Sequence, residues 1–438
     1  MSFISKYLNS VRALQFLQLF RFIALLLVGI VLSKTSIGIS QIGTYETFLL
    51  ISGASCFFWT GGMLQAMLSI KREPQGEKTA SYFNIFLIFT ALAIVTSAAI
   101  LLLQSQIATF VGFSGNRIPY LKILLAYIVF SCPANLVEYI YLIENKPYRI
   151  AAYGAIVFTL QILAVTIPVI ITNDLGYGLY GLLGITLLRF VWLAIIVLRF
   201  SQLKLSGRYI SEFFRLSAPF ILSVLIVKGI QYADSFLVAY RFDESTYAQF
   251  RYGAKEFPLI LLPVTAFSEA MSSRIANNSN FTETLANIKI ENRRIMHLCI
   301  PLAMVAIITS KYIYPFVFNE DFCESALIFN IYCFASVFRF IVPESILVGR
   351  RQSRPILAAA AVNILVNVLL GLVLMSFVGI VGVAIAFLIG CLIEKVILVS
   401  VVKSLYGIKP SEYMDTRIFL YYILLMLVSL MVSFIGMF

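Results

Sequence analysis

The sequence predicts an all-α polytopic membrane protein with two six-helix lobes and a thirteenth helix at the C-terminus. Of its 438 residues, 61% are hydrophobic and only 12% are charged, whereas soluble proteins average roughly 45–50% and 25%. Apolar segments of about 20 residues, the length that crosses a bilayer core, recur along the whole chain. The net charge of +12 lies mainly between these segments, so it indicates membrane topology, and we expect no nucleic acid partner.

The apolar segments form two sets of six. The first set covers residues 12–33, 41–70, 80–104, 118–143, 150–172 and 177–200. The second set covers residues 214–240, 247–271, 294–317, 325–348, 355–377 and 379–402. Residues 417–438 are long enough to span once more. The first segment lacks a small-residue cleavage motif, so we expect it to remain as an anchor.

These segments predict four parts of the chain. They are an N-terminal lobe at 1–200, a cytoplasmic linker at 201–213, a C-terminal lobe at 214–405, and a cytoplasmic connection with the extra helix at 406–438. Translocated loops avoid Lys and Arg. Most loop cations fall on the N-terminal side of the membrane, and the exceptions are Lys34, Arg117, Lys122, Arg241 and Lys311. The N-terminus is therefore predicted to be cytoplasmic.

Short matches between the halves support the two-lobe interpretation. Gly43-Thr-Tyr-Glu46 matches Gly253-Ala-Lys-Glu256, and Gly178-x-x-Gly181 matches Gly379-x-x-Gly382. The matches occur in the same order in both halves, and six helices per lobe give both lobes one orientation. Repeats of this kind place a substrate site at their interface.

Several kinds of site chemistry are missing from the sequence. His297 is the only histidine, which argues against a histidine metal site or a Ser-His-Asp triad; we expect it at a helix start. The six cysteines form no C-x-x-C pair and are expected to be small buried hydrophobic residues. No phosphate-binding G-x-x-x-x-G-K-[ST] loop is present, so we expect neither a nucleotide-hydrolysing site nor a cofactor.

Cations inside the apolar segments are the main candidates for function. Each costs about 2.5–3.5 kcal/mol at the centre of a lone helix. They are Arg21, Arg189, Lys228, Arg251, Lys255, Arg339 and Lys395. No acid lies within one turn of Arg21, which predicts a water-filled cavity for an anion. Residues 250–258, read as a helix, place Arg251 and Lys255 on one face. Guanidinium groups bind oxyanions in a bidentate way. All of these intramembrane cations except Lys395 are therefore candidate ligands of an anionic head group.

Internal pairing with acids is the alternative explanation. The candidate partners are Glu46, Glu138, Asp234, Glu256, Glu269, Glu344 and Glu394. We expect Lys395 to pair locally with Glu394 near a helix end, and a local pair of Lys228 with Asp234 remains open. Buried acids can also carry a driving H+ or Na+, and Glu46, Asp234, Glu256 and Glu344 are the candidates for ion coupling.

With these features, the chain resembles the Wzx-type polysaccharide (O-antigen) flippases of the multidrug/oligosaccharidyl-lipid/polysaccharide (MOP) exporter superfamily. The resemblance covers about residues 1–405 and is sharpest at 246–274. It implies a V-shaped, MATE-like alternating-access fold whose lobes are helices 1–6 and 7–12. Arg21, and Arg251 with Lys255, match the cavity positions thought to hold the pyrophosphate. The single extra helix differs from lipid II flippases, which have two.

The resemblance also implies a substrate and a location. An undecaprenyl-pyrophosphate-linked oligosaccharide, such as the O-antigen repeat unit of lipopolysaccharide, would cross the bacterial inner membrane, with bilayer lipids and other polysaccharide assembly proteins as partners. A multidrug cation exporter on the same scaffold is the alternative, since organic cations favour acids and aromatic rings. A membrane-embedded enzyme, such as a glycan polymerase, is a third hypothesis, but the sequence shows no large extramembrane loop or His and Asp cluster.

Overall fold

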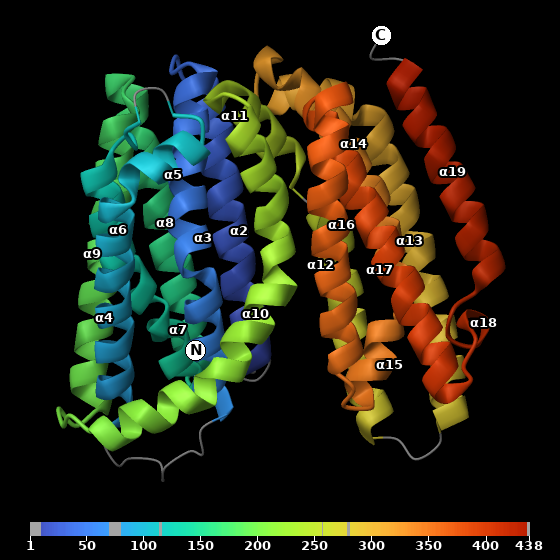
Figure 1. The fold of residues 1–438 in the computed structure, drawn as a ribbon, viewed down its shortest axis with the longest axis horizontal. Coiled ribbons are helices and arrows are strands. Elements are labelled where there is room, and N and C mark those ends of the chain that lie inside the picture. Colours follow the sequence, from blue (N-terminus) through green and yellow to red (C-terminus); the bar gives the residue numbers. More distant parts are fainter. Residues whose placement is uncertain (1–9, 70–79, 114–115, 256, 278–280, 436–438) are drawn as a thin grey trace. The chain divides into compact units, whose positions relative to one another are not determined.

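The described residues of the first half of the chain form nine helices. The computed structural model describes residues 10–69, 80–113, 116–255, 257–277 and 281–435. Within them, the first half contains α2 (Ser10–Lys34), α3 (Ile39–Ser69), α4 (Ser81–Leu102), α5 (Gln104–Phe110), α6 (Leu121–Ala134), α7 (Leu136–Ile143), α8 (Pro147–Thr172), α9 (Leu175–Phe200) and α10 (Gly207–Arg241). Figure 1 shows these helices in blue to green. Helix α8 packs against α2 and α9, and α6 packs against α4 and α9.

All regular secondary structure in the described residues of the second half is also helical. It contains α11 (Glu244–Gly253), α12 (Pro258–Asn277), α13 (Phe281–Val317), η1 (Glu320–Phe322), α14 (Cys323–Ala335), η2 (Ser336–Phe340), α15 (Pro343–Gly349), α16 (Arg354–Val378), α17 (Ile380–Tyr406), α18 (Pro410–Tyr413) and α19 (Thr416–Ile435). Helices α16 and α17 form a hairpin, and α14 packs on both α13 and α17. The last helix, α19, lies along α13 (Figure 1).

The predicted fold class is confirmed. In the described part of the chain, 13 helical segments are long and apolar enough to cross a membrane, and no strand is present. The thirteenth, Thr416–Phe434, matches the expected final span. The protein is therefore a multi-pass all-α membrane protein.

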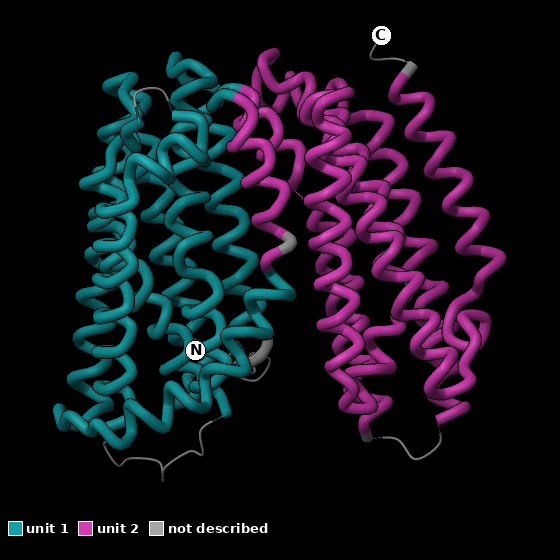
Figure 2. The backbone as a smooth tube through the Cα atoms, viewed as in Figure 1, with its two compact units in different colours: residues 1–228, 243–245 teal, residues 229–242, 246–438 magenta. Residues whose placement is uncertain are grey.

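Contacts group the chain into two compact units. Unit 1 contains residues 1–228 and 243–245, and unit 2 contains residues 229–242 and 246–438 (Figure 2). The division falls inside α10, which starts at Gly207. Much of the segment expected to link two lobes, 201–213, is therefore the first part of a long helix.

Two expectations about helix ends are corrected. The predicted segments 247–271 and 294–317 leave residues 272–293 outside any span, but α12 runs to Asn277 and α13 already begins at Phe281. His297 consequently lies inside α13 rather than at a helix start. Its Nδ1 atom and the hydroxyl of Tyr422 are 2.5 Å apart, which ties α13 to α19.

Three spans are interrupted at or near a proline. The fourth span breaks at Asn135, after Pro133, and the tenth breaks at residues 341–342, before Pro343. The eighth breaks between Gly253 and Pro258. Proline lacks an N–H and disfavours helical geometry at the preceding residue. Backbone of this kind is tolerated at membrane depth where protein or a polar cavity surrounds it.

The glycine repeat seen in the sequence has a packing role in both units. A Cβ on Gly181 of α9 would lie 1.7 Å from the carbonyl oxygen of Ala164 in α8. A Cβ on Gly382 of α17 would lie 2.4 Å from the carbonyl carbon of Leu374 in α16. In each hairpin the second glycine of the G-x-x-G match lets two helix backbones touch, which a larger residue would prevent.

Candidate functional site

Arg21 lies near the middle of α2 and has an acidic partner on another helix. Its Nη2 atom donates a hydrogen bond of 2.8 Å to Oε2 of Glu138 in α7, and its guanidinium lies 5.4 Å from the ring centroid of Phe158 in α8. The expectation of an arginine without a compensating acid is therefore wrong. That expectation considered only residues within one turn, whereas Glu138 is 117 residues away in the sequence. The Arg21 side chain is still 36% exposed.

Arg189 of α9 is buried and is held by neutral groups. It is 7% exposed, and its Nε atom donates to the hydroxyl of Tyr153 at 3.0 Å. Its Nη2 atom donates to the side-chain oxygen of Asn135 at 3.1 Å. Both partners come from other helices of unit 1, so the guanidinium links α9 to α8 and to the break in the fourth span.

One interrupted helix thus supplies partners to both candidate site arginines of unit 1, Arg21 and Arg189. Asn135 lies at the junction of α6 and α7, and Glu138 lies in the first turn of α7. Negative groups are stabilised in the first turn of a helix by the orphan N–H groups and the helix dipole. The break that follows Pro133 therefore creates the polar centre of unit 1. Glu46 of α3, a candidate for ion coupling, is also buried, at 5% exposed.

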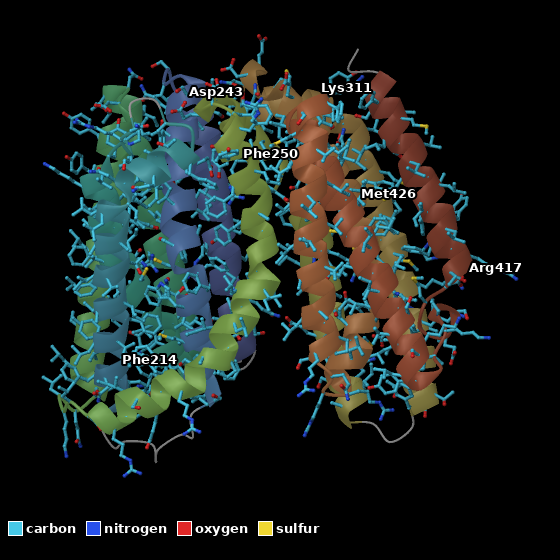
Figure 3. The ribbon with its side chains drawn as sticks, in the orientation of Figure 1. Phe214, Asp243, Phe250, Lys311, Arg417 and Met426 are labelled. Carbon is cyan, nitrogen blue, oxygen red and sulfur yellow. The ribbon has the colours of Figure 1, made fainter. Side chains whose placement is uncertain are left out.

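The stretch around Arg251 is not one continuous helix. Helix α11 ends at Gly253 and α12 begins at Pro258, so the prediction that Arg251 and Lys255 share a helix face is wrong. Phe250, labelled in Figure 3, is fully buried, with its ring centroid 6.3 Å from that of Tyr332. Lys255 lies over the ring of Tyr252 at 4.1 Å. Glu256 lies outside the described residues.

Asp234 of α10 lies in a buried polar site of unit 2. It is 4% exposed. Its Oδ1 atom accepts a hydrogen bond of 2.7 Å from the side-chain amide of Asn367 in α16, and its Oδ2 atom accepts one of 2.5 Å from the hydroxyl of Tyr332 in α14. These partners are neutral. The proposed local pair with Lys228 does not form, and Lys228 is exposed.

Asn367 and Tyr332 each bring a side-chain oxygen into the neighbourhood of Asp234. The side-chain oxygen of Asn367 is buried and has no hydrogen-bond donor among the described residues. It belongs to the amide that donates to Asp234, so this oxygen and the carboxylate come from neighbouring helices. Carboxylate, amide and hydroxyl oxygens are hard ligands that suit hard cations better than soft ones. The residues present therefore fit a small cation, and Asp234, Asn367 and Tyr332 would hold it.

A charged cavity lies beside this site in unit 2. Its volume is about 130 Å³. The ten residues that line it are Tyr332, Ala335, Ser336, Phe338, Arg339, Glu344, Phe387, Cys391, Glu394 and Lys395. They come from α14, η2, α15 and α17, and the broken tenth span contributes the greater part. Two predicted site residues, Arg339 and Glu344, thus share one cavity.

The pairing of charges around this cavity differs from the expected pattern. Lys395 forms its ion pair with Glu344 and also donates to the carbonyl of Ile341 at 3.1 Å. Glu394 instead accepts a hydrogen bond of 2.6 Å from the side-chain amide of Asn363. The predicted local pair of Lys395 with Glu394 is wrong because adjacent residues of a helix point in different directions. Burial and, secondarily, the charge of Glu344 raise the pKa of Tyr413, in the connection before α19.

The polar asparagines of α16 were missed at the level of the sequence. Asn363 and Asn367 lie four residues apart in an otherwise apolar segment, and both are buried. Paired amides at this spacing share a helix face, so they were a usable signal. The cysteines behave largely as expected: Cys56, Cys132, Cys299 and Cys333 are buried, and all six are free thiols.

Comparisons with solved structures identify the fold. The lipid II flippase MurJ, in an inward closed conformation, aligns with 95% of this chain and 97% of its own at a TM-score of 0.70 and 18% identity. An inward-facing multidrug resistance MATE family transporter of the MOP superfamily aligns with 91% of this chain and 100% of its own, at a TM-score of 0.61 and 12% identity. A MOP superfamily transporter from Pyrococcus furiosus aligns with 89% of this chain and 92% of its own, at a TM-score of 0.59 and 15% identity.

The chain has the MurJ and MATE fold. No family model matches the sequence, and no curated protein does. At these identities the likeness establishes the architecture, and the substrate has to be argued from the residues of this chain.

Proposed function

We propose that this protein is a flippase that moves an undecaprenyl-pyrophosphate-linked oligosaccharide, such as an O-antigen repeat unit, across the bacterial inner membrane by alternating access. It is a transporter rather than an enzyme, with its N-terminus in the cytoplasm. The sugar diphosphate binds to intramembrane basic residues while the lipid tail stays in the bilayer. On this route the charged and hydroxyl groups of the substrate do not cross the hydrocarbon core without partners, which would carry a large free-energy cost. The MurJ fold, found in a flippase of a lipid-linked substrate, supports the proposal.

The exposed but fixed guanidinium of Arg21 is the observation that carries the proposal. Glu138 and Phe158 hold this side chain in place, yet 36% of it remains exposed. A guanidinium has five N–H donors in a planar fork, and the ion pair with Glu138 uses one of its nitrogens. The remaining donors suit a diphosphate, which guanidinium groups bind through paired hydrogen bonds. Arg251, Lys255, Arg339 and Lys228 are the further candidates for head-group binding, whereas the burial of Arg189 on Tyr153 and Asn135 assigns it a structural role.

We propose that a cation drives the cycle and that Asp234 binds it. The oxygen set of Asp234, Asn367 and Tyr332 supports this role, as does the buried amide oxygen of Asn367 without a donor. A buried carboxylate with neutral partners is costly unless a cation or proton neutralises it. Na+ or H+ at Asp234 would supply that charge. Glu46, Glu344 and Glu256 are the remaining candidates for ion coupling.

Glycan export by single variants tests the function. In a deletion strain we expect lipid-linked glycan to accumulate and surface glycan to disappear. Arg21→Ala and Arg251→Ala should fail to restore export at normal protein levels. Arg208→Ala is the matched control, because the Arg208 side chain is 90% exposed on the first turn of α10, and it should restore export. Wild-type surface glycan in Arg21→Ala cells would contradict the proposal.

Export of organic cations is the second candidate function. Two buried carboxylates favour it: Asp234, which is 4% exposed and accepts from the hydroxyl of Tyr332, and Glu46, which is 5% exposed. Acids and aromatic rings attract organic cations, and MATE family transporters share the fold. Cells that express the protein would then grow at higher concentrations of cationic dyes. Unchanged dye sensitivity together with glycan accumulation in the deletion strain favours the flippase.

A further inference from the structure

Two helical stripes line the charged cavity of unit 2. Residues at helical spacing share one face of their element, and the lining residues follow this spacing. They are Tyr332, Ala335, Ser336 and Arg339 along α14 and η2, and Phe387, Cys391, Glu394 and Lys395 along α17. The cavity of about 130 Å³ therefore lies between two facing stripes, and the broken tenth span completes its lining with Phe338 and Glu344.

The charges of the described residues that line this cavity balance. Arg339 and Lys395 supply two positive charges, and Glu344 and Glu394 supply two negative ones. An ion of either sign would be repelled by two of these four side chains. A neutral ligand that both donates and accepts hydrogen bonds can use all four, and hydrogen bonds to charged groups are stronger than those between neutral groups. The cavity therefore favours a neutral polar ligand.

Two of the charged groups are held in place by contacts that leave part of their bonding capacity unused. Lys395 donates to Glu344 and to the carbonyl of Ile341, and an ammonium group has three donors. Asn363 donates to one oxygen of Glu394 at 2.6 Å, and a carboxylate has about four acceptor positions. Lys395 and Glu394 can thus bond a ligand without giving up the contacts that fix them.

Stacked aromatic rings form an apolar wall of the same cavity. The ring centroids of Tyr332 and Phe387 are 4.4 Å apart, with the ring planes 16° from parallel. The hydroxyl of Tyr332 donates to Asp234, which holds this ring in position. The electron-rich face of an aromatic ring attracts polarised C–H groups, and a sugar ring carries such groups on its faces. Stacked rings beside fixed donors and acceptors match the two kinds of surface that a sugar has.

The volume of the cavity suits one sugar ring. It has room for roughly ten water molecules at 10–15 Å³ each, whereas pockets for larger ligands reach about 300–1,000 Å³. The hydroxyl groups of a single ring would replace the hydrogen bonds of that water. Charges that only stabilise the fold would pack closely, because buried ion pairs are favourable only with close and complete bonding. A cavity among four charged side chains indicates a ligand instead.

We propose that this cavity binds one neutral sugar residue of the lipid-linked glycan. The inference rests on the proposed flippase function and specifies which residues recognise the glycan. Phe387 and Tyr332 pack against a C–H face of the sugar ring. Glu394 accepts hydrogen bonds from its hydroxyl groups, and Lys395 and Arg339 donate to them. Arg339, a candidate for the head group, is thereby assigned to the sugar.

Equilibrium binding to the purified full-length chain in detergent micelles, measured by microscale thermophoresis, tests the sugar site. The two ligands are undecaprenyl pyrophosphate and the undecaprenyl-pyrophosphate-linked glycan extracted from the deletion strain. We expect wild type to bind the glycan-linked form about tenfold more tightly, which corresponds to one hydrogen bond to a charged group. Phe387→Leu and Glu394→Gln should each remove most of this preference and leave the binding of undecaprenyl pyrophosphate unchanged.

Matched controls carry the same substitutions outside the cavity. Phe377→Leu changes a ring of α16 that is 79% exposed, and Glu324→Gln lies on the exposed first turn of α14. Both should keep the wild-type preference. The side-chain oxygen in Glu394→Gln still accepts from Asn363, so this variant should fold normally. A neutral sugar also predicts that the ratio of the two affinities stays constant as salt is raised, because salt screens interactions between charges.

The outcomes separate this inference from the proposed function. A wild-type preference that persists in Phe387→Leu and Glu394→Gln overturns the sugar site and leaves the flippase standing. Equal wild-type affinity for the two ligands does the same. A ratio that falls with salt overturns the neutral sugar, and loss of both ligands in the two variants, with a normal gel-filtration profile, contradicts a site for the sugar alone. If the deletion strain accumulates no lipid-linked glycan, or wild type binds neither ligand, the proposed function fails and the sugar site fails with it.

Discussion

Asp234 and Asn367 join α10 to α16 through a hydrogen bond of 2.7 Å between a buried carboxylate and a buried amide. The carboxylate has two neutral partners, Asn367 and Tyr332, and neither supplies a positive charge. This arrangement differs from Arg21 and Glu138 in unit 1, where the acid is neutralised by a guanidinium. Asp234 is thus a candidate for reversible binding, whereas Glu138 is held in a permanent pair.

Substitution of Asp234 by asparagine should uncouple transport. The variant keeps a side-chain oxygen that accepts from Tyr332 or Asn367, so we expect normal folding, but it removes the charge that attracts the cation. Glycan export should fall at least about tenfold, equivalent to roughly 1.4 kcal/mol, at an unchanged amount of membrane protein. Export equal to wild type would remove Asp234 from the coupling mechanism.

The Arg21–Glu138 pair should show coupled effects on stability. Glu138→Ala leaves a guanidinium without its acid, and because Arg21 is 36% exposed, we expect about 1–3 kcal/mol of destabilisation rather than the larger cost of a fully buried charge. The double variant Arg21→Ala/Glu138→Ala should be more stable than the sum of the single effects by roughly 0.5–3 kcal/mol. Melting temperatures of the four proteins in detergent measure this, and strictly additive shifts would contradict the pair.

Gly181→Ala and Gly382→Ala should each destabilise the protein. The added Cβ would collide with backbone atoms of the preceding helix in both hairpins, and overpacking of this kind costs about 1–3 kcal/mol. Gly184→Ala in α9 is the control, because no heavy atom lies within 4 Å of its Cβ position. We expect lower melting temperatures for the first two variants and little change for the third. Equal stability of all three would disprove close helix contact at these glycines.

Arg189→Lys should weaken unit 1. The guanidinium donates to Tyr153 through Nε and to Asn135 through Nη2, and a single ammonium group cannot reproduce this fork. One buried oxygen would lose its donor, which costs about 1–3 kcal/mol. A reduced melting temperature, with glycan export reduced only in proportion to protein amount, is the expected result. If export is lost at a normal melting temperature, Arg189 contacts the substrate instead.

Proline positions explain where the expected helices failed. The sequence predicts one helix over residues 250–258, but the structure ends α11 at Gly253 and begins α12 at Pro258. The break before Pro343 likewise separates Arg339 from Glu344 into two short elements. Local sequence indicates that a proline weakens a helix. Whether the helix continues, as it does through Pro219 inside α10, or stops depends on what the freed backbone groups contact.

The sequence by itself determined the membrane class, the thirteen spans and the unusual cations within them, because hydrocarbon penalises polar groups strongly enough to dominate every other signal. Only the tertiary structure decided which charge meets which partner. Glu138 reaches Arg21 across 117 residues, and Asn363, rather than the adjacent Lys395, bonds Glu394. Side chains on neighbouring helices approach each other through packing, and the spacing of residues along one helix carries no information about that approach.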